Sequence, residues 1–258
     1  MRHESLAYTV GFTGIVCAVC SVLVSTSAVS LHERQKNNVV LDRQKKVLAV
    51  AGLLPDGRIS RATIESIYQK NIRARVIDLA SGEVAEDIDV ATFDQQAAAQ
   101  DPATSQVAPA NAARVKRVPT YGMVYEVTHG ANVDLVVIPI EGKGLWSTLY
   151  GYLALGKDAN TIAGITFYQH GETPGLGGEV DNPKWKSLWQ GRKAFDERGE
   201  VRLSVIKGNA GPPASDPYQV DGLSGATLTS RGVSALVKFW LSETGFGPYL
   251  DKFRERSS

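Results

Sequence analysis

The feature that most constrains this chain is a long uncharged stretch close to its N-terminus. No Asp, Glu, Lys, Arg or His occurs from Ser5 to Leu31, and the stretch is rich in Val, Ala and Leu. A helix of about 20 apolar residues crosses the ~30 Å hydrocarbon core of a bilayer. We therefore predict one transmembrane helix over about residues 6–31, within a membrane anchor of residues 1–33.

A cleaved signal peptide is the alternative interpretation, because the small residues from Ser25 to Ala28 resemble a cleavage site. The apolar region is too long, and the basic segment before it too weak, for a typical signal.

The orientation of this helix in the membrane is less constrained by the sequence. Five Lys and Arg residues follow between positions 34 and 46, whereas only Arg2 precedes the stretch. The positive-inside rule favours a cytoplasmic domain, although long domains cross regardless of such charge.

Cysteine and histidine positions limit the metal chemistry that we expect. Cys17 and Cys20 both lie in the apolar stretch, so the chain after Leu31 has no thiol for a disulfide, a zinc thiolate site or an iron–sulfur cluster. We interpret the two cysteines as small packing residues, and their use by a neighbouring subunit is the alternative. Neither His129 nor His170 has a second His at i+3 or i+4. We therefore assign no metal site.

Residues 34–120 show weaker patterns than the rest of the chain. Apolar residues at helical spacing predict a stalk helix over residues 39–54, which a Pro-Asp-Gly turn at 55–57 would end. Residues 58–94 mix helical and extended patterns, and residues 95–113 indicate a surface loop or weak helix. We expect a stalk helix followed by an α/β insert.

Residues 121–258 carry the densest β-type pattern. Strands are predicted near 124–127, 133–140, 149–155, 162–168 and 201–207. Pro183 is a favourable first residue for a helix that would run to Gly191. We predict an α+β fold: one transmembrane helix, then a mixed, mostly antiparallel sheet domain with helices packed on one side.

The stretch from Asp221 to Ser230 is the most informative for chemistry. Small residues at 224–226 leave the Thr227 hydroxyl accessible to another protein's active site. An apolar stripe at 233, 236, 237, 240 and 241 predicts a helix that ends before Gly245. A phosphate on Thr227 would meet the unpaired N–H groups at the start of that helix. A Gly-containing turn with an ordinary Ser or Thr cap is the alternative.

This stretch resembles the flavinylation motif Asp-x-x-Ser/Thr-Gly-Ala-Thr/Ser of FMN-binding domains in the Na⁺-translocating NADH:quinone reductase and its Rnf relatives. In that family a flavin transferase uses FAD to esterify the last Thr with FMN through its phosphate. The resemblance implies a covalent FMN on Thr227. The other positions of the motif that it implies at the cofactor site are Asp221, Leu223, Ser224, Gly225 and Ala226.

A second stretch, from His170 to Gly178, combines glycines and a proline with two hydrogen-bonding side chains, Glu172 and Thr173. An ordinary strand-to-loop turn would have the same composition. The Glu-Thr-Pro-Gly-Leu-Gly run resembles a second signature of the same family, in which this loop packs beside the isoalloxazine ring. That resemblance adds Glu172, Thr173, Leu176 and Gly177 to the expected cofactor site.

Two further candidates are less specific. The segment from Gly142 to Ser147 resembles a Gly-x-Gly-Leu-Trp loop that lines the flavin pocket in these domains, which implies a role for Trp146, although Trp146 could equally be a core residue. The segment lacks the Gly-Lys-Ser/Thr pattern of a phosphate loop. Lys207 is a candidate to stabilise negative charge on a reduced flavin, and an ordinary exposed lysine is the alternative.

Taken over nearly the whole chain, these features resemble the family of C subunits of the sodium pump. The resemblance implies a redox carrier that relays electrons from NADH toward ubiquinone, coupled to Na⁺ export. It also implies a single-pass protein of the bacterial inner membrane, with its domain on the periplasmic side. The implied partners are the other subunits of the complex, the flavin transferase and membrane lipid.

Several functions are not supported by the sequence. The chain has no dinucleotide fingerprint, so NADH is expected to bind elsewhere, and no hydrolase constellation, so we assign no catalytic residues. Net charge is +1 with scattered Lys and Arg, so no nucleic acid partner is expected. Three alternatives stay open: the equivalent subunit of an Rnf complex, a membrane-anchored assembly or sensor module with a flavin-type fold, and a flavin enzyme that reduces small substrates.

Overall fold

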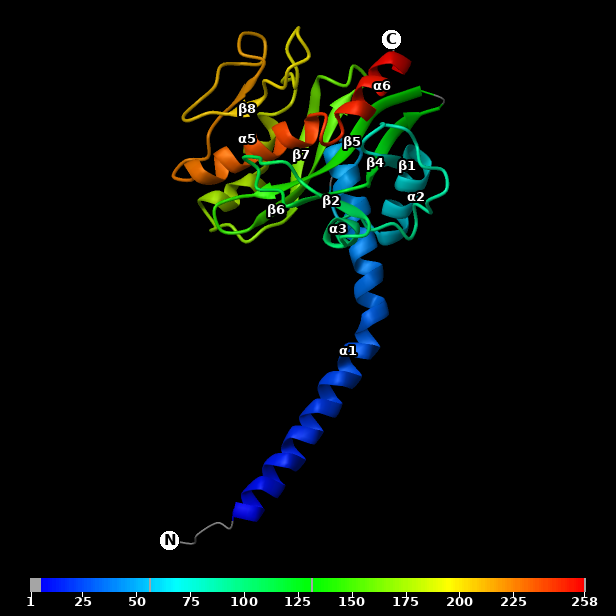
Figure 1. The fold of residues 1–258 in the computed structure, drawn as a ribbon, viewed down its shortest axis with the longest axis vertical. Helices are drawn as coiled ribbons and strands as arrows, with labels where there is room; N and C mark the ends of the chain where they lie inside the picture. The colour runs from blue at the N-terminus through cyan, green and yellow to red at the C-terminus, as the bar shows by residue number, and fades with distance from the viewer. Residues whose placement is uncertain (1–5, 56, 131, 258) are drawn as a thin grey trace. The chain divides into compact units, whose positions relative to one another are not determined.

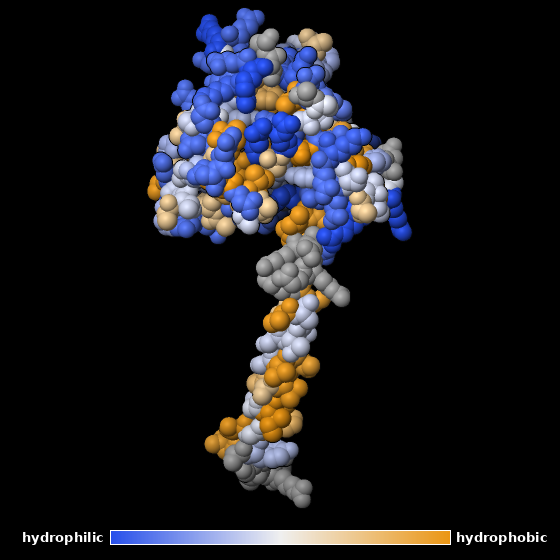
Figure 2. Space-filling view, turned by 90° about the vertical axis from the view of Figure 1, so that its right-hand side faces the viewer, coloured by the Kyte–Doolittle hydropathy of each residue, from blue (hydrophilic) through white to orange (hydrophobic). Residues whose placement is uncertain are grey.

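The computed structural model describes residues 6–55, 57–130 and 132–257, which fall into two compact units, Met1–Gln44 and Lys45–Ser258. Helix α1, Leu6–Val50, makes up the described part of the first unit and continues into the second (Figure 1). Within it, Tyr8–Leu31 has a mean hydropathy of 2.1 and none of it is buried, so it is long and apolar enough to cross a membrane (Figure 2). This agrees with the predicted transmembrane helix.

The predicted stalk helix is not a separate element, because α1 is continuous from Leu6 to Val50. The residues between the two predicted helices, 32–38, include Glu, Arg, Gln and Lys and contain no Gly or Pro, so the sequence tolerates a helix there. The helix also ends earlier than predicted. Gly52 has a φ of +70°, and Leu53 N–H donates to the Leu48 carbonyl over 2.9 Å, as in a Schellman motif. Asp56 of the predicted turn lies outside the described residues.

The second unit is built on a five-stranded antiparallel sheet in the order β1-β4-β5-β6-β7. The strands are β1 Ile72–Asp78, β4 Tyr121–His129, β5 Asn132–Lys143, β6 Thr148–Gly156 and β7 Ile162–Gln169. The last four confirm the strands predicted from residue 121 to residue 168. The boundary predicted between residues 120 and 121 stays a prediction, although β1 from the earlier stretch joins this sheet.

Helices cover both faces of the sheet, whereas the sequence pattern predicts helices on one side. Helix α5, Thr227–Leu241, packs on one face through Leu236 and Trp240, which join a buried cluster with Ile138 and Ile140. Side chains of neighbouring strand residues point to opposite faces. On the other face, Gln96 of α3 donates to the Tyr168 hydroxyl over 3.0 Å, and the carbonyl of Val50 lies against β7.

The remaining elements surround this sheet. They are α2 Arg61–Asn71, α3 Gln95–Gln100, β2 Ser105–Val107, β3 Arg117–Pro119, the 3₁₀ helix η1 Gly177–Asp181, α4 Pro183–Ser187, β8 Ser204–Val205, β9 Gln219–Val220 and α6 Gly247–Ser257. Two of the predicted elements are too long. Of the strand predicted over residues 201–207, only Ser204–Val205 forms a strand, β8, because Val201 instead makes an isolated bridge with Phe195. The helix predicted from Pro183 to Gly191 ends at Ser187, where turns replace it.

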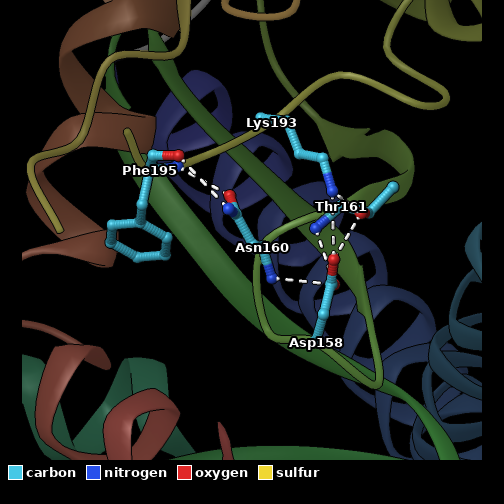
Figure 3. A network of polar contacts seen from close by, with 5 residues as sticks. All are labelled: Asp158, Asn160, Thr161, Lys193 and Phe195. Carbon is cyan, nitrogen blue, oxygen red and sulfur yellow. Dashed lines mark hydrogen bonds and ion pairs between the residues drawn. The ribbon is translucent and has the colours of Figure 1, made fainter. Parts of the chain in front are cut away.

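The turn between β6 and β7 is fixed by Asp158, whose contacts are drawn in Figure 3. Its carboxylate accepts hydrogen bonds from Thr161 Oγ1 (2.5 Å), the backbone N–H groups of Asn160 and Thr161, and Lys193 Nζ (3.1 Å). Asn160 in turn pairs with the backbone of Phe195. The network therefore ties the turn to the segment after α4, which packs beside the sheet.

We predict that Asp158→Asn lowers stability at neutral pH and loses that effect in acid. Burial alone would raise the pKa of Asp158, but hydrogen bonds from Thr161, Asn160 and Lys193 outweigh it and lower the pKa from 3.8 to about 2. The stabilisation is therefore complete above pH ~4 and lost as the pH falls toward 2. Because 44% of the side chain is exposed, we expect only ~1 kcal/mol.

Thermal unfolding of the full chain in detergent, measured at pH 7 and pH 3, checks this prediction. The matched control is Asp87→Asn, since Asp87 is exposed and its carboxylate makes no hydrogen bond within the described part of the chain. A deficit of Asp158→Asn that is equal at both pH values would contradict the electrostatic explanation.

Candidate functional site

Three segments that the sequence singles out meet at the carboxylate of Glu172. Glu172 follows β7 and is 5% exposed. Its Oε1 accepts the backbone N–H groups of Trp146 (2.9 Å) and Ser147 (3.1 Å), and its Oε2 accepts the N–H of Leu145 (3.2 Å) and the hydroxyl of Thr229 (2.6 Å). The carboxylate thus joins the β5–β6 turn, its own loop and the first turn of α5.

The environment of Glu172 keeps its carboxylate charged. Burial would raise the pKa of Glu172, but the hydrogen bonds from Thr229, Ser147, Trp146 and Leu145 outweigh burial and lower it. A charged acceptor that receives this many donors is a strong anchor for the surrounding backbone. Glu172 is therefore occupied in holding the loops, with both oxygens engaged.

The loop of Glu172 has two further supports. Glu172 N–H donates to His170 Nδ1 over 3.2 Å, and His170 Nε2 lies 2.8 Å from Asp181 Oδ2, so the imidazole bridges the loop and η1. Gly171 N–H donates to Ser147 Oγ over 2.6 Å. The sequence analysis considers His170 as a metal ligand and assigns it no metal, and the pattern of residues contains no sign of this bridging role.

Helix α5 approaches the end of β5 unusually closely, and two glycines allow it. A Cβ on Gly232 of α5 would collide with the carbonyl oxygen of Lys143, and a Cβ on Gly142 of β5 would lie 2.6 Å from the Cβ of Leu236. Both distances are shorter than the contacts that Cβ atoms make in real proteins. The pair therefore fixes the position of α5 over the sheet, and with it the position of Thr227.

Thr227 is the first residue of α5, and it is exposed. The N-cap residue of α5 is Ala226, which has no side chain to accept a hydrogen bond from the helix. The first turn of a helix presents unpaired N–H groups and the positive end of the helix dipole. Thr227 therefore has an exposed hydroxyl at a helix end that attracts anions, which is the combination that the sequence predicts.

The other hydroxyls of this segment differ in accessibility. Thr229 and Ser230 are buried, and each is engaged: Thr229 donates to Glu172, and Ser230 Oγ accepts the N–H of Leu223 over 3.0 Å. Ser224 and Thr227 are exposed. Since Thr229 points inward and supports Glu172, it belongs to the site, although it is not among the residues that the sequence predicts there. Thr229 lies two positions after Thr227, and helical residues two positions apart point in different directions, so this spacing is the sequence signal for its inward orientation.

Exposed apolar side chains occur in each of the three segments that Glu172 joins. Leu145, Trp146, Leu176 and Leu228 are all exposed, with Trp146 at 67%. Leu176 lies next to the motif, because a Cβ on Gly225 would lie 2.9 Å from its Cδ2, and the turn that carries Trp146 is bonded to Glu172. Exposed apolar groups of this kind mark a surface that binds a ligand or partner.

The remaining predicted residues have structural surroundings. The carboxylate of Asp221 accepts the Ala210 N–H over 2.9 Å, and the Asp221 carbonyl accepts Trp185 Nε1 over 2.8 Å. Leu223 and Ala226 are buried, Gly177 packs against Glu172, and Gly225, Thr173 and Lys207 are exposed. Direct cofactor contact by these residues stays a prediction. The described residues contain no cluster of three or more His, Cys, Asp or Glu able to hold a metal.

The chain is similar to known proteins over nearly its whole length. The FMN-binding domain family matches residues 144–242, which include the β5–β6 turn, the loop of Glu172 and the start of α5. The chain is 46% identical over 257 residues to the C subunit of the Na(+)-translocating NADH-quinone reductase of Pseudomonas aeruginosa, with 98% of each chain covered. It is 44% identical over 260 residues to the protein of the same name from Vibrio parahaemolyticus, with 98% and 97% covered.

Two solved structures are similar to the chain. The crystal structure of Shewanella oneidensis NqrC has a TM-score of 0.77 and 36% identity, with 83% of this chain and 97% of that chain covered. The structure of the C subunit of the Na(+)-translocating NADH-quinone reductase from Parabacteroides distasonis has a TM-score of 0.66 and 27% identity, with 85% and 96% covered. The predicted fold class, an apolar N-terminal helix followed by a mostly antiparallel sheet domain, is confirmed.

We predict that Glu172→Gln destabilises the domain by ~2 kcal/mol, because an amide NH₂ would face backbone donors that now meet a carboxylate oxygen. Chemical denaturation of the full chain in detergent at pH 7 measures the change. Glu197→Gln is the matched control, since Glu197 is exposed and its side chain makes no described contact. Equal stability of the two variants would show that Glu172 does not hold the three segments together.

Proposed function

The chain belongs to the family of C subunits of the Na(+)-translocating NADH-quinone reductase, and on that basis we propose that it carries electrons through an FMN covalently bound to Thr227. It is thus part of an oxidoreductase complex and has an FMN-binding domain. The observation that supports the attachment site is the exposed Thr227 hydroxyl at the uncapped start of α5. The alternative of an Rnf-type subunit has less support, because the full-length relatives described above are quinone reductase subunits.

Attachment at Thr227 would form one bond and break one bond. In this proposal a flavin transferase brings FAD, Thr227 Oγ loses its proton and bonds to the phosphorus of the FMN half, and the anhydride bond to AMP breaks. The phosphodiester keeps one negative charge. The N–H groups and dipole of the first turn of α5 stabilise that charge.

The exposed apolar side chains near Thr227 would hold the ring system. Trp146 and Leu176 come from loops that Glu172 fixes, and Leu228 follows Thr227 directly in α5. Planar aromatic groups pack well on such surfaces. FMN, when bound, supplies one-electron transfer, and the chain supplies its placement and electrostatic surroundings. We propose that Asp221, Thr173 and Lys207 border this region, with Asp221 shaping the neighbouring loop through Ala210.

The position of the carrier in the complex follows from what this chain lacks. Its sequence has no dinucleotide fingerprint, so NADH binds to another subunit, and electrons pass through this chain toward ubiquinone. The candidate span Tyr8–Leu31 has no ionisable carboxylate or basic side chain, so Na⁺ would cross through other subunits. We place the domain on the periplasmic side of the inner membrane, with lipid around α1.

The covalent attachment predicts that the native chain is heavier than its polypeptide by FMN less one water. Thr227→Ala should abolish the added mass, because no nucleophilic oxygen remains at the helix start, whereas Thr227→Ser should retain it. Mass spectrometry of the intact chain, expressed with and without the flavin transferase, measures this. Ser60→Ala is a matched control, since Ser60 is an exposed hydroxyl at the N-terminus of α2. Flavin that persists in Thr227→Ala would contradict the assigned residue.

The periplasmic placement predicts that Glu197→Cys reacts with a membrane-impermeant maleimide in intact cells. Glu197 is exposed, and the chain after Leu31 has no other thiol, so the unsubstituted chain measures any background from Cys17 and Cys20. Labelling only after the inner membrane is broken would place the domain in the cytoplasm.

A further inference from the structure

A cleft with basic walls lies on the side of the domain formed by β1, the β4–β5 hairpin and α6. It has a volume of about 470 Å³. We call it the basic cleft, and its lining residues are Arg73, Arg75, Glu126, Asn132, Val133, Asp134, Lys157, Phe253 and Arg256. None of them belongs to the segments around Thr227, so the cleft is a separate site.

The lining of the basic cleft carries a surplus of positive charge. Four cationic side chains face two carboxylates, Glu126 and Asp134. Glu126 is already engaged, because it accepts Arg75 Nε over 3.0 Å and the Tyr249 hydroxyl over 3.1 Å. Asp134 contacts His129 over 2.6 Å. The surplus of two charges equals the charge of a phosphate monoester near neutral pH, which is about −1.5 to −2.

Three of the cations have no carboxylate of their own. Within the described part of the chain, no Asp or Glu oxygen forms an ion pair with Arg73, Lys157 or Arg256. All three are exposed. They come from separate elements: Arg73 from the edge strand β1, Lys157 from the β6–β7 turn and Arg256 from α6. Like charges converge in this way at an energetic cost, which a bound anion would remove.

The walls of the basic cleft also suit an organic group beside the anion. Val133 and Phe253 add apolar surface, and Asn132 adds an amide. The guanidinium of Arg256 lies over the rings of Tyr249 and Phe253, 5.7 and 6.0 Å from their centroids, which restrains its orientation. Arginine forks match the oxygens of a phosphate group in a bidentate manner.

The position of the basic cleft separates it from the proposed flavin site. In Figure 1, β1 and α6 lie on the opposite side of the domain from the N-terminal end of α5. Figure 2 looks onto that side and shows strongly hydrophilic side chains near the middle of the face, with hydrophobic ones beside them. A ligand in the basic cleft would therefore not compete with a group on Thr227.

We propose that the basic cleft binds a phosphate-bearing anion, held by Arg73, Lys157 and Arg256. Two sources share this chemistry: a soluble phosphate compound and the headgroup of an anionic phospholipid. The proposal does not depend on a flavin at Thr227.

Calorimetric titration of the purified full chain in nonionic detergent tests the proposal, with ionic strength held constant by NaCl because such binding is screened by salt. Inorganic pyrophosphate is the soluble probe, and micelles doped with phosphatidylglycerol are the lipid probe, with phosphatidylcholine as the neutral lipid. We expect saturable binding of at least one probe, with a dissociation constant below about 1 mM. Binding of pyrophosphate alone indicates a soluble ligand, and binding of phosphatidylglycerol alone indicates a headgroup.

Variants identify the site. Arg73→Ala combined with Arg256→Ala should weaken binding about tenfold or more, since each removes a charge-assisted contact. Lys157→Gln provides a second, single change on an exposed turn. Arg58→Ala is the matched control, an exposed arginine outside the basic cleft. Thr227→Ala should bind the probe as the unsubstituted chain does, which separates this proposal from the flavin attachment. Absence of binding by both probes, or equal weakening by Arg58→Ala, would overturn the proposal.

Discussion

Four donors converge on the carboxylate of Glu172, and they come from two parts of the chain that lie far apart in the sequence. The β5–β6 turn supplies three backbone N–H groups, and the first turn of α5 supplies the hydroxyl of Thr229. A buried charge is costly unless such donors satisfy it. Because the buried carboxylate needs hydrogen bonds from all of these groups, Glu172 fixes Trp146 and the start of α5 relative to each other. The arrangement of the exposed surface near Thr227 follows from these contacts.

The membrane helix, the central strands and the Thr227 helix could all be predicted from the sequence because each has a local signal. The uncharged stretch, the β-branched runs and the apolar stripe after Thr227 depend on neighbouring residues only. The roles of Glu172, Thr229 and Ser230 could not be predicted, since they arise from contacts between distant segments. Helix α6 was missed for a related reason: its buried residues, Tyr249, Leu250 and Phe253, form too short a pattern between polar residues.

The two sides of the domain would hold their ligands by different interactions. Around Thr227, a covalent link and exposed apolar side chains would hold a cofactor that must stay accessible to electron-transfer partners. On the side of β1 and α6, charges that lack carboxylate partners within the described part of the chain would hold an anion reversibly. The sheet connects these two regions, because its five strands are hydrogen-bonded in one antiparallel sheet. Each side can therefore be altered by exposed substitutions without rebuilding the core.

Gly142 and Gly232 leave no room for side chains where α5 crosses the end of β5. This close contact limits which substitutions the chain can accept during evolution. A larger residue at either position would have to lift the helix, and lifting it would also pull Thr229 away from Glu172. Substitutions at the two glycines should consequently be rare. A Cβ on Gly232 would meet backbone atoms of Lys143, which no side-chain change can relieve, whereas a Cβ on Gly142 would meet the Leu236 side chain. Related chains should therefore show correlated variation between positions 142 and 236.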